Sequence, residues 1–307
     1  MSENKPFVSV IICTQNRKEY LKKYALPSVF GLAYPNYEVI IVDDSSNDGT
    51  ELFLQNYTDP RKRLKIIRNK RSNGIACARN IGSYYAQGEI VAFTDDDCFV
   101  AMNWLDELIG KFMENKNLMA AGGFVADRDS DKPAFAENQI YGCNMAFRKE
   151  VFNKFLFDSN LFFHKAPFHE ETDFVNRLER HGYLTVYVPK ALVMHFAGPA
   201  SYRGINRRIG NHLNSVYMDA KKFSLARYYY KIFKRSNEMF RKIKQLYNEK
   251  ILSFPQALFE IGWVNCILFF EIPWKAKKAH FREEKIFNLE AGENKLNDLF
   301  LKSVKLP

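Results

Sequence analysis

The chain has 307 residues, enough to bury a substantial core, and its 47% hydrophobic and 26% charged content excludes a disordered or fibrous protein. Its net charge of +10 comes from the C-terminal third, because residues 201–307 hold 21 of the 45 Lys and Arg but only 10 of the 35 Asp and Glu. Such asymmetry indicates contact with an anionic partner, such as a membrane surface or nucleic acid, although a solvated basic helical face explains it equally well.

The first half of the chain alternates apolar runs with helical patterns. The apolar, β-branched runs that predict strands are residues 7–13, 37–44, 64–69 and 89–95. The helical patterns between them are residues 19–32, which contain Pro27 at a kink or boundary, 49–57 and 74–88. Strands that are apolar throughout are buried on both faces. The pattern therefore predicts an α/β fold of the doubly wound kind, with a mainly parallel sheet flanked by helices.

From residue 119 the order of elements changes. The expected elements are a strand at 119–125, a polar loop at 127–138, a strand and helix start at 141–152, a helix at 169–182, and strands at 183–189 and 191–198. Beyond residue 200 strand signals end, and basic, aromatic helical stretches such as 225–250 take over. We expect two parts: an α/β catalytic domain over 1–200 and a basic, aromatic-rich helical region over 201–307.

Several features bear on the location of the protein in the cell. Residues 254–274 are nearly long enough to span a bilayer, but Glu260, Asn265 and Glu271 interrupt them, which favours a core or interfacial helix. The five cysteines are odd in number and form no CxxC pair, as expected of reduced thiols. The N-terminus has no signal-peptide pattern. We expect a cytoplasmic protein that associates peripherally with the inner face of the membrane.

Polar residues follow each predicted strand of the first half. In open α/β sheets ligands bind beyond the carboxyl ends of the strands. The polar segments at those ends are Thr14–Arg17, Asp43–Ser46, Asn69 with Asn73 and Gly74, and Asp95–Asp97. The sequence therefore predicts a site at one edge of the sheet.

The triplet Asp95, Asp96 and Asp97 ends a buried strand. One aspartate is enough to cap the helix expected after it. Three carboxylates repel one another, and a hard divalent cation offsets that repulsion. The triplet therefore predicts an Asp-x-Asp site for Mg²⁺ or Mn²⁺ that also binds a diphosphate.

Three further features each have a structural and a functional interpretation. Asp44 ends an apolar strand, where it either caps a loop or accepts a hydrogen bond from a base or ribose. The segment 169–174, with Glu170 and Glu171, either complements a helix dipole or supplies a general base. His195 is either structural or a ligand to metal or phosphate. The chain has no GxGxxG, GxxxxGK[ST] or GxSxG motif, which disfavours dinucleotide-binding, P-loop and hydrolase functions.

Taken together, five ordered segments resemble family 2 glycosyltransferases, which have the GT-A fold. They are VSVIICTQNR, YEVIIVDDSSNDGT, NGIACARNIGSYYAQGEIVAFTDDD, GCNMAFRKEVF and HEETDFVNRLERHGYLTVYVPKALVMH, and they cover about residues 7–200. The resemblance implies inverting transfer of a sugar from a nucleotide-diphosphate donor to an acceptor hydroxyl.

The resemblance also implies roles for individual residues. The nucleotide-sugar pocket would comprise Thr14, Asn16, Arg17, Asp44, Asn73, Gly74, Arg79, Asp95 and Asp96. The metal, Mn²⁺ or Mg²⁺, would be held by Asp97 with Asp95 and His195. Glu170 and Glu171 occupy the family's acceptor-side Glu-Asp pair, and Glu171 stands where the catalytic Asp is expected. Glutamate has the same chemistry but reaches one methylene further, and Cys13 replaces a common proline.

The expected donor is a UDP-sugar, with dTDP- and GDP-sugars as alternatives. The expected acceptor is a glycan, glycolipid or glycoprotein in cell-surface polysaccharide or glycoconjugate synthesis, and residues 201–307 would contact an anionic membrane surface rather than nucleic acid. Two other functions remain open at this point. One is a basic-surface binding protein on a degenerate sugar-nucleotide fold, and the other is a metal-dependent nucleotidyltransferase.

Overall fold

The computed structural model describes residues 5–127, 138–161, 169–196, 205–222 and 266–287, together with isolated residues between 229 and 264. These residues form two compact units, one drawn mainly from residues 1–204 and the other mainly from 205–291. The polar loop expected at 127–138 and most of the basic stretch 225–250 lie outside the described residues. No helix in the described part of the chain is both long and apolar enough to cross a membrane.

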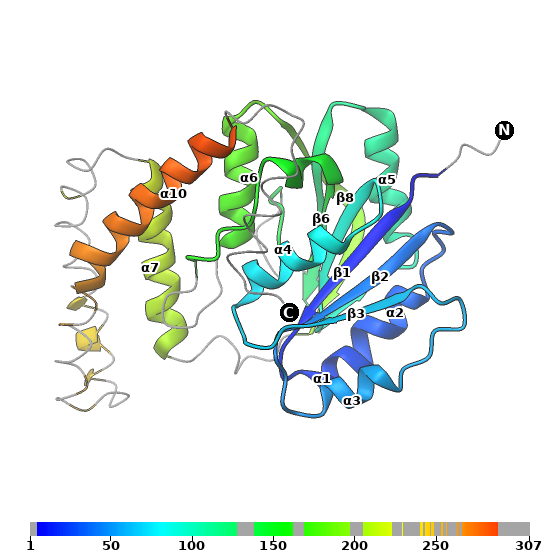
Figure 1. The fold of residues 1–307 in the computed structure, drawn as a ribbon, viewed down its shortest axis with the longest axis horizontal. Helices are drawn as coiled ribbons and strands as arrows, with labels where there is room; N and C mark the ends of the chain where they lie inside the picture. Colours follow the sequence, from blue (N-terminus) through cyan, green and yellow to red (C-terminus); the bar gives the residue numbers. More distant parts are fainter. Residues whose placement is uncertain are drawn as a thin grey trace. The chain divides into compact units, whose positions relative to one another are not determined.

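The first unit is built on one mixed sheet (Figure 1). Its strands are β1 (Val8–Thr14), β2 (Tyr37–Asp43), β3 (Leu64–Arg68), β4 (Ile90–Asp95), β5 (Cys98–Val100), β6 (Leu118–Asp127), β7 (Met145–Arg148) and β8 (Leu184–His195). Across the described residues they follow the order β3-β2-β1-β4-β7-β6-β8-β5. The first four are mutually parallel, and β7 and β5 run antiparallel to their neighbours. The α/β class and the mainly parallel sheet expected from the sequence are confirmed.

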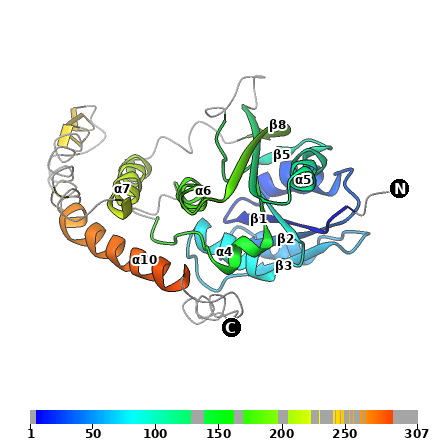
Figure 2. The same ribbon diagram turned by 90° about the horizontal axis from the view of Figure 1, so that it is seen from above.

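Helices cover both faces of this sheet. They are α1 (Lys18–Tyr20), the π-helix η1 (Leu21–Ala25), α2 (Leu26–Phe30), α3 (Thr50–Gln55), α4 (Ile75–Tyr85), α5 (Trp104–Glu114), the 3-10 helix η2 (Lys149–Asn153) and α6 (Glu170–Arg180). Figure 2 shows α4 and α6 on one face and α5 on the other. Side chains of β1 alternate accordingly: Val10 and Ile12 pack in one core cluster and Ile11 in the other. Every residue of β1 is buried, as its mainly apolar sequence predicts.

Aromatic rings fill the core under α6. Phe147 and Phe174 lie edge to face with ring centroids 5.1 Å apart, and Phe157 stacks on Phe174 at 4.3 Å. Phe93 and Phe152 complete the same cluster. Offset-stacked and edge-to-face pairs are the favourable geometries for aromatic rings. Part of the high phenylalanine content is thus explained by core packing, and the N-terminal half of α6 is held firmly against the sheet.

Two local features differ from the simple sequence pattern. The helix expected at 19–32 is continuous from α1 through the π-turn η1 into α2, and Pro27 lies just after the π-turn, where the regular hydrogen-bond pattern is already interrupted. The two strands expected at 183–189 and 191–198 are one strand, β8, whose register with β6 shifts between Gly123 and Phe124. Pro189 lies at this irregularity, because proline cannot donate a ladder hydrogen bond.

The second unit is helical in the described residues. It contains α7 (Ile205–Lys222), the π-helix η5 (Ile267–Glu271) and α10 (Ile272–Phe287). Leu213 and Tyr217 of α7 pack in one buried cluster with Leu268 and Ile272. A helical region after about residue 200 agrees with the sequence pattern, and the division into domains at residue 200 remains a proposal.

Candidate active site

The polar segments that follow the strands lie at one edge of the sheet. Thr14 at the end of β1 is in register with Asp43 of β2, and Cys13 is in register with Asp95 of β4. Asp43 is in register with Arg68 of β3. The predicted convergence of the strand ends is therefore present in the structure, and every candidate residue can be placed relative to it.

Thr14, Asn16 and Arg17 form the end of β1 and the turn after it. The Thr14 hydroxyl donates to Asp96 Oδ2 at 2.7 Å. Asn16 has a left-handed backbone, φ 54°, and its Oδ1 accepts from the backbone N–H of Asn47 at 2.7 Å. The Asn16 bond ties the turn after β1 to the loop after β2, and the Thr14 bond ties the end of β1 to the aspartates after β4.

Asp44 is buried and its carboxylate accepts several hydrogen bonds from the segment before α4. Asn69 Nδ2 donates to it at 2.7 Å and the Ser72 hydroxyl at 2.8 Å. The backbone N–H groups of Asn73 and Gly74 also donate to it. Gly74 has φ 82°, a conformation that side chains disfavour. In this structure Asp44 shapes the 69–74 segment, and its contact with a nucleotide base stays a prediction.

Asp97 and His195 come together although almost a hundred residues separate them. Strand β5 pairs with β8 so that Cys98 is opposite His195. His195 Nε2 lies 3.6 Å from Asp97 Oδ1, and one ligand atom from each of Asp97, Cys98 and His195 lies within 4.8 Å of the others. A carboxylate and an imidazole at this separation fit a single divalent ion such as Mn²⁺. The donor set present therefore suits the expected metal.

Arg17 lies beside the two later aspartates of the triplet. Its guanidinium forms ion pairs with Asp96, at 3.1 Å, and with Asp97. Burial raises the pKa of Asp96 to about 8, against the opposing charge of Arg17. The Arg17 guanidinium offsets the repulsion between Asp96 and Asp97, and Asp97 Oδ1 faces His195 Nε2.

Arg79 joins the end of β4 to the start of α6. Its guanidinium donates to Glu170 Oε1 at 2.6 Å and to Asp95 Oδ1 at 3.2 Å, and the side chain is 4% exposed. Gly142 makes room for it, since a Cβ there would lie 2.3 Å from Arg79 Nη2. Burial alone would lower the pKa of Arg79, but Glu170 and Asp95 hold it above its usual value. Arg79 is thus a buried bridge beneath the site, and Asp95 is paired with it.

Glu170 and Glu171 open helix α6. Glu170 is buried, and its Oε2 has no hydrogen-bond partner among the described residues. Burial and the neighbouring charge of Glu170 raise the pKa of Glu171 to about 8, although Arg79 opposes the shift. The residue before them, His169, has φ 71°. A strained cap beside two acids, one of them with a raised pKa, is typical of a functional helix start.

The site can carry out three tasks. Asp97 and His195 can hold a cation, and Asp96, Arg17 and Thr14 can support that position. Glu171 has a pKa suited to a general base near neutral pH. Two contributors were missed by sequence reasoning. Cys98 is brought to the site only by the pairing of β5 with β8, and Gly142 is recognisable only once Arg79 is seen packed against it.

Comparisons with known proteins agree on one family. The model of the family described as glycosyl transferase family 2 matches residues 9–173. An uncharacterized glycosyltransferase of Haemophilus influenzae is 27% identical over 241 residues, which are 70% of this chain and 69% of the relative. The UDP-Glc:alpha-D-GlcNAc-diphosphoundecaprenol beta-1,3-glucosyltransferase WfgD of Escherichia coli is 30% identical over 149 residues, which are 48% of this chain and 54% of the relative.

Among solved structures, the fold is similar to that of the mannosyltransferase PcManGT from Pyrobaculum calidifontis in complex with GDP-Man and Mn²⁺. The TM-score is 0.59 at 20% identity, and the match covers 95% of this chain and 89% of that one. At this identity the likeness concerns the fold, which is that of a GT-A glycosyltransferase.

Proposed function

The chain belongs to glycosyl transferase family 2 and is a glycosyltransferase, and from that premise we propose that it moves a sugar from a nucleotide-diphosphate donor to an acceptor hydroxyl with inversion. The observation that carries the proposal is the meeting of Asp97 and His195 at the sheet edge, with Glu171 tied to the same edge through Glu170, Arg79 and Asp95. A cation site and a candidate base on opposite sides of one edge are what such a transfer needs.

In this proposal Glu171 takes the proton from the acceptor hydroxyl. The acceptor oxygen then forms its bond to the anomeric carbon on the face opposite the diphosphate, the bond from that carbon to the diphosphate oxygen breaks, and the electron pair leaves with the diphosphate. Glu170 and Arg79 hold the start of α6 in place during the step. Asp97 and His195 would hold Mn²⁺ or Mg²⁺, which when bound supplies positive charge against the departing diphosphate.

We assign the donor side to residues at the ends of β1, β2 and β4 and in the segment between β3 and α4. The nucleotide sugar would be surrounded by eight residues and would have Arg79 beneath it. The eight are Thr14, Asn16, Arg17, Asp44, Asn73, Gly74, Asp95 and Asp96. The name of the E. coli relative includes UDP-Glc and that of the Pyrobaculum neighbour GDP-Man, so a UDP-sugar is the first candidate and a GDP-sugar the second. The diphosphoundecaprenol acceptor in the relative's name supports a lipid-linked glycan as acceptor, and with it association of residues 201–307 with the inner face of a membrane.

A thermal-shift screen tests the donor assignment. UDP-, GDP- and dTDP-sugars are each added with Mn²⁺ to the wild-type chain and to Asp97→Ala. A bound donor raises the melting temperature by mass action. We expect one nucleotide class to stabilise the wild type and not the variant. Equal stabilisation of both proteins, with and without EDTA, would refute the metal assignment.

A further inference from the structure

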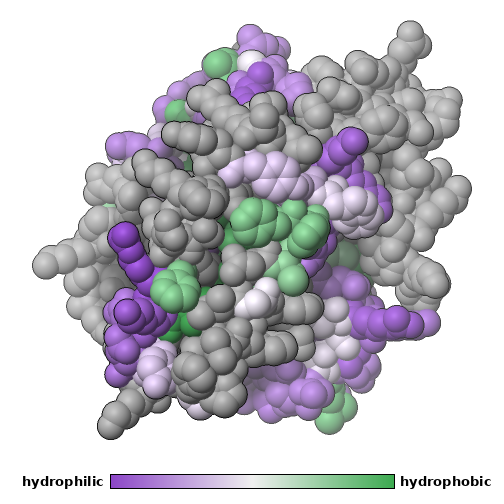
Figure 3. All heavy atoms as spheres, turned by 90° about the vertical axis from the view of Figure 1, so that its left-hand side faces the viewer, coloured by the Kyte–Doolittle hydropathy of each residue, from purple (hydrophilic) through white to green (hydrophobic). Residues whose placement is uncertain are grey.

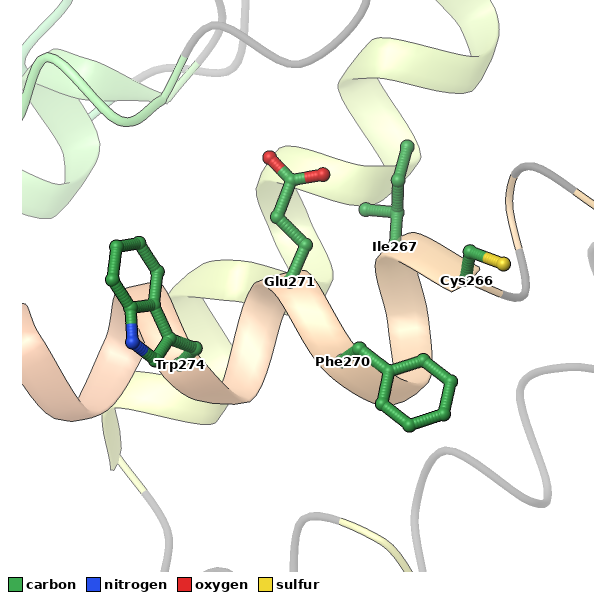
Figure 4. A pocket seen from close by; sticks show the side chains of 5 residues that line it. All are labelled: Cys266, Ile267, Phe270, Glu271 and Trp274. Carbon is green, nitrogen blue, oxygen red and sulfur yellow. The ribbon is translucent and has the colours of Figure 1, made fainter.

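The stretch from η5 into α10 presents two aromatic side chains to solvent. Phe270 is 75% exposed and Trp274 is 62% exposed, which places both among the most exposed large apolar side chains of the described residues. Single exposed apolar residues are common on soluble proteins. Their positions in the sequence differ by four, so the two side chains lie on the same side of one helix. In Figure 4 both project from the same stretch of helix, with α7 behind it.

Lysines continue the same side of the helix. Lys277 and Lys278 are exposed and follow Phe270 at helical spacings of seven and eight residues. The Lys278 ammonium group lies 4.9 Å from the centroid of the Trp274 ring. The exposed side of the helix therefore carries two aromatic side chains followed by two basic ones. We call Phe270, Trp274, Lys277 and Lys278 the aromatic–lysine stripe.

The opposite side of the same helix is buried. Leu268, Ile272 and Ala276 are buried in the cluster that includes Leu213 and Tyr217 of α7. The aromatic–lysine stripe is thus not the face that holds the helix in the unit. A shallow hollow of about 330 Å³ lies beside Phe270 and Trp274 and is lined also by Cys266, Ile267 and Glu271. On the face drawn in Figure 3, apolar side chains gather near the centre, with hydrophilic side chains around them.

The net charge of this region distinguishes between the possible binding partners of the stripe. Residues 201–307 hold 21 Lys and Arg against 10 Asp and Glu, so the part of the chain that carries the stripe is strongly basic. In a symmetric dimer a second copy would bring the same positively charged stripe to the contact and would be repelled. An anionic bilayer attracts it, and tryptophan, phenylalanine and lysine are the side chains that suit the headgroup boundary.

We propose that the aromatic–lysine stripe docks on an anionic lipid bilayer, with the rings of Phe270 and Trp274 entering the boundary between headgroups and acyl chains. Lys277 and Lys278 contact lipid phosphates on the same side. This inference rests on the proposed function in one respect only: docking on a membrane gives a structural basis for sugar transfer to a lipid-linked acceptor. It places the membrane contact on four named residues of the basic region.

The experiment measures binding of the full chain to vesicles. Sedimentation is compared for vesicles of phosphatidylcholine alone and of equal parts phosphatidylcholine and phosphatidylglycerol, at low and high salt. We expect the wild type to bind the anionic vesicles, less at high salt, and Phe270→Ala with Trp274→Ala to weaken that binding about tenfold or more. Lys277→Glu with Lys278→Glu should weaken it by a similar factor. Vesicles should also shift the tryptophan emission of the wild type to shorter wavelength, and not that of Trp274→Phe.

The matched control is Leu52→Ala with Met102→Ala, which removes side chains that are 65% and 66% exposed in the first unit. It should bind vesicles like the wild type. If the control weakens binding as much as the aromatic pair, or if neither lysine nor aromatic variant changes it, the proposal is wrong. Loss of a concentration-dependent dimer in the aromatic variant would assign the stripe to self-association instead and would also overturn it.

A separate measurement keeps this inference apart from the proposed function. Donor-induced thermal stabilisation and transfer to a soluble acceptor are measured without vesicles. Both should be the same in the wild type and the three stripe variants, because none of the four stripe residues belongs to the site. Absence of donor binding in the wild type would refute the proposed function while leaving the vesicle result to decide the docking face.

Discussion

At the residue scale, the chemistry of the site depends on where each carboxyl group lies. Asp97 is next to His195, Asp96 is buried beside Arg17, and Asp95 is paired with Arg79. Arg17 also pairs with Asp97, so the two later aspartates share one arginine while Asp95 pairs with another. Only Asp97 of the three faces the imidazole, and the three have distinct roles that single substitutions can test.

Substitution of Glu171 tests the proposed base. Glu171→Gln keeps the size of the side chain but cannot accept a proton. We expect the turnover number for transfer to fall about 100-fold or more, with donor binding unchanged, because general-base catalysis contributes factors of that order. Turnover is measured with saturating donor and acceptor, and donor binding by thermal shift. Glu170→Gln is the matched control, and if it alone abolishes transfer the neighbouring acid is the base.

The pH dependence of transfer tests the ionisation of the same residue. The pKa of Glu171 is raised to about 8 by burial and by Glu170, so below that pH the ionised fraction that can act as a base falls about tenfold per pH unit. We expect kcat/KM to rise with pH and to level off above about pH 8 in the wild type. The residual activity of Glu171→Gln should lack this rise. A flat wild-type profile from about pH 6 to about pH 9 would contradict the assignment.

At the element scale, the start of α6 is connected to the end of β4 through a side chain of α4. Arg79 bonds to Glu170 on one side and Asp95 on the other, in a space left by Gly142. The aromatic cluster beneath fixes the helix at Phe174. The positions of α4, β4 and α6 are therefore coupled through Arg79. A substitution of Arg79 should displace the start of α6, where Glu171 lies, without altering Glu171 itself.

Two substitutions test this bridge. Arg79→Ala leaves Glu170 buried without its cation, and we expect the free energy of unfolding to fall by about 3 kcal/mol, as when one partner of a buried ion pair is removed. Gly142→Ala keeps all charges but pushes the guanidinium aside, since its Cβ would lie 2.3 Å from Nη2. It should lower turnover more than stability. Arg180→Ala, at the exposed end of α6, is the control, and urea unfolding with transfer assays measures both effects.

Much of the arrangement of strands and helices was predictable from the sequence, and some of it was not. The run Val8–Thr14 had to be a buried strand because it is mainly apolar and β-branched. The polar residues after such strands had to meet at one edge. The pairing of β5 with β8 could not be read from local pattern, because Cys98 and His195 are far apart in sequence. For the same reason the position of Arg79 between two acids emerged only from the packing of α4, β4 and α6.

At the scale of the whole molecule, the half-buried acid Glu171 also affects stability. The pKa of Glu171 is raised from 4.5 to about 8, so over this range the folded state binds more protons than the unfolded state. Stability from this group is fully present below pH 4.5 and is lost as pH rises towards about 8. We expect the free energy of unfolding of the wild type to decline over that interval, and that of Glu171→Gln to decline less. Urea unfolding at a series of pH values measures both, and parallel profiles would contradict the shift.

The measurement that tests the proposed transfer most directly is metal-dependent release of nucleoside diphosphate from the donor. The wild type, Asp97→Ala and Glu171→Gln are each incubated with the stabilising nucleotide sugar, an acceptor and Mn²⁺. We predict that only the wild type releases the diphosphate above background, that EDTA abolishes the release, and that Glu171→Gln alone among the variants still binds donor. Equal release by all three proteins, or release that EDTA leaves unchanged, would contradict the assignment of Asp97 to the cation and Glu171 to the acceptor.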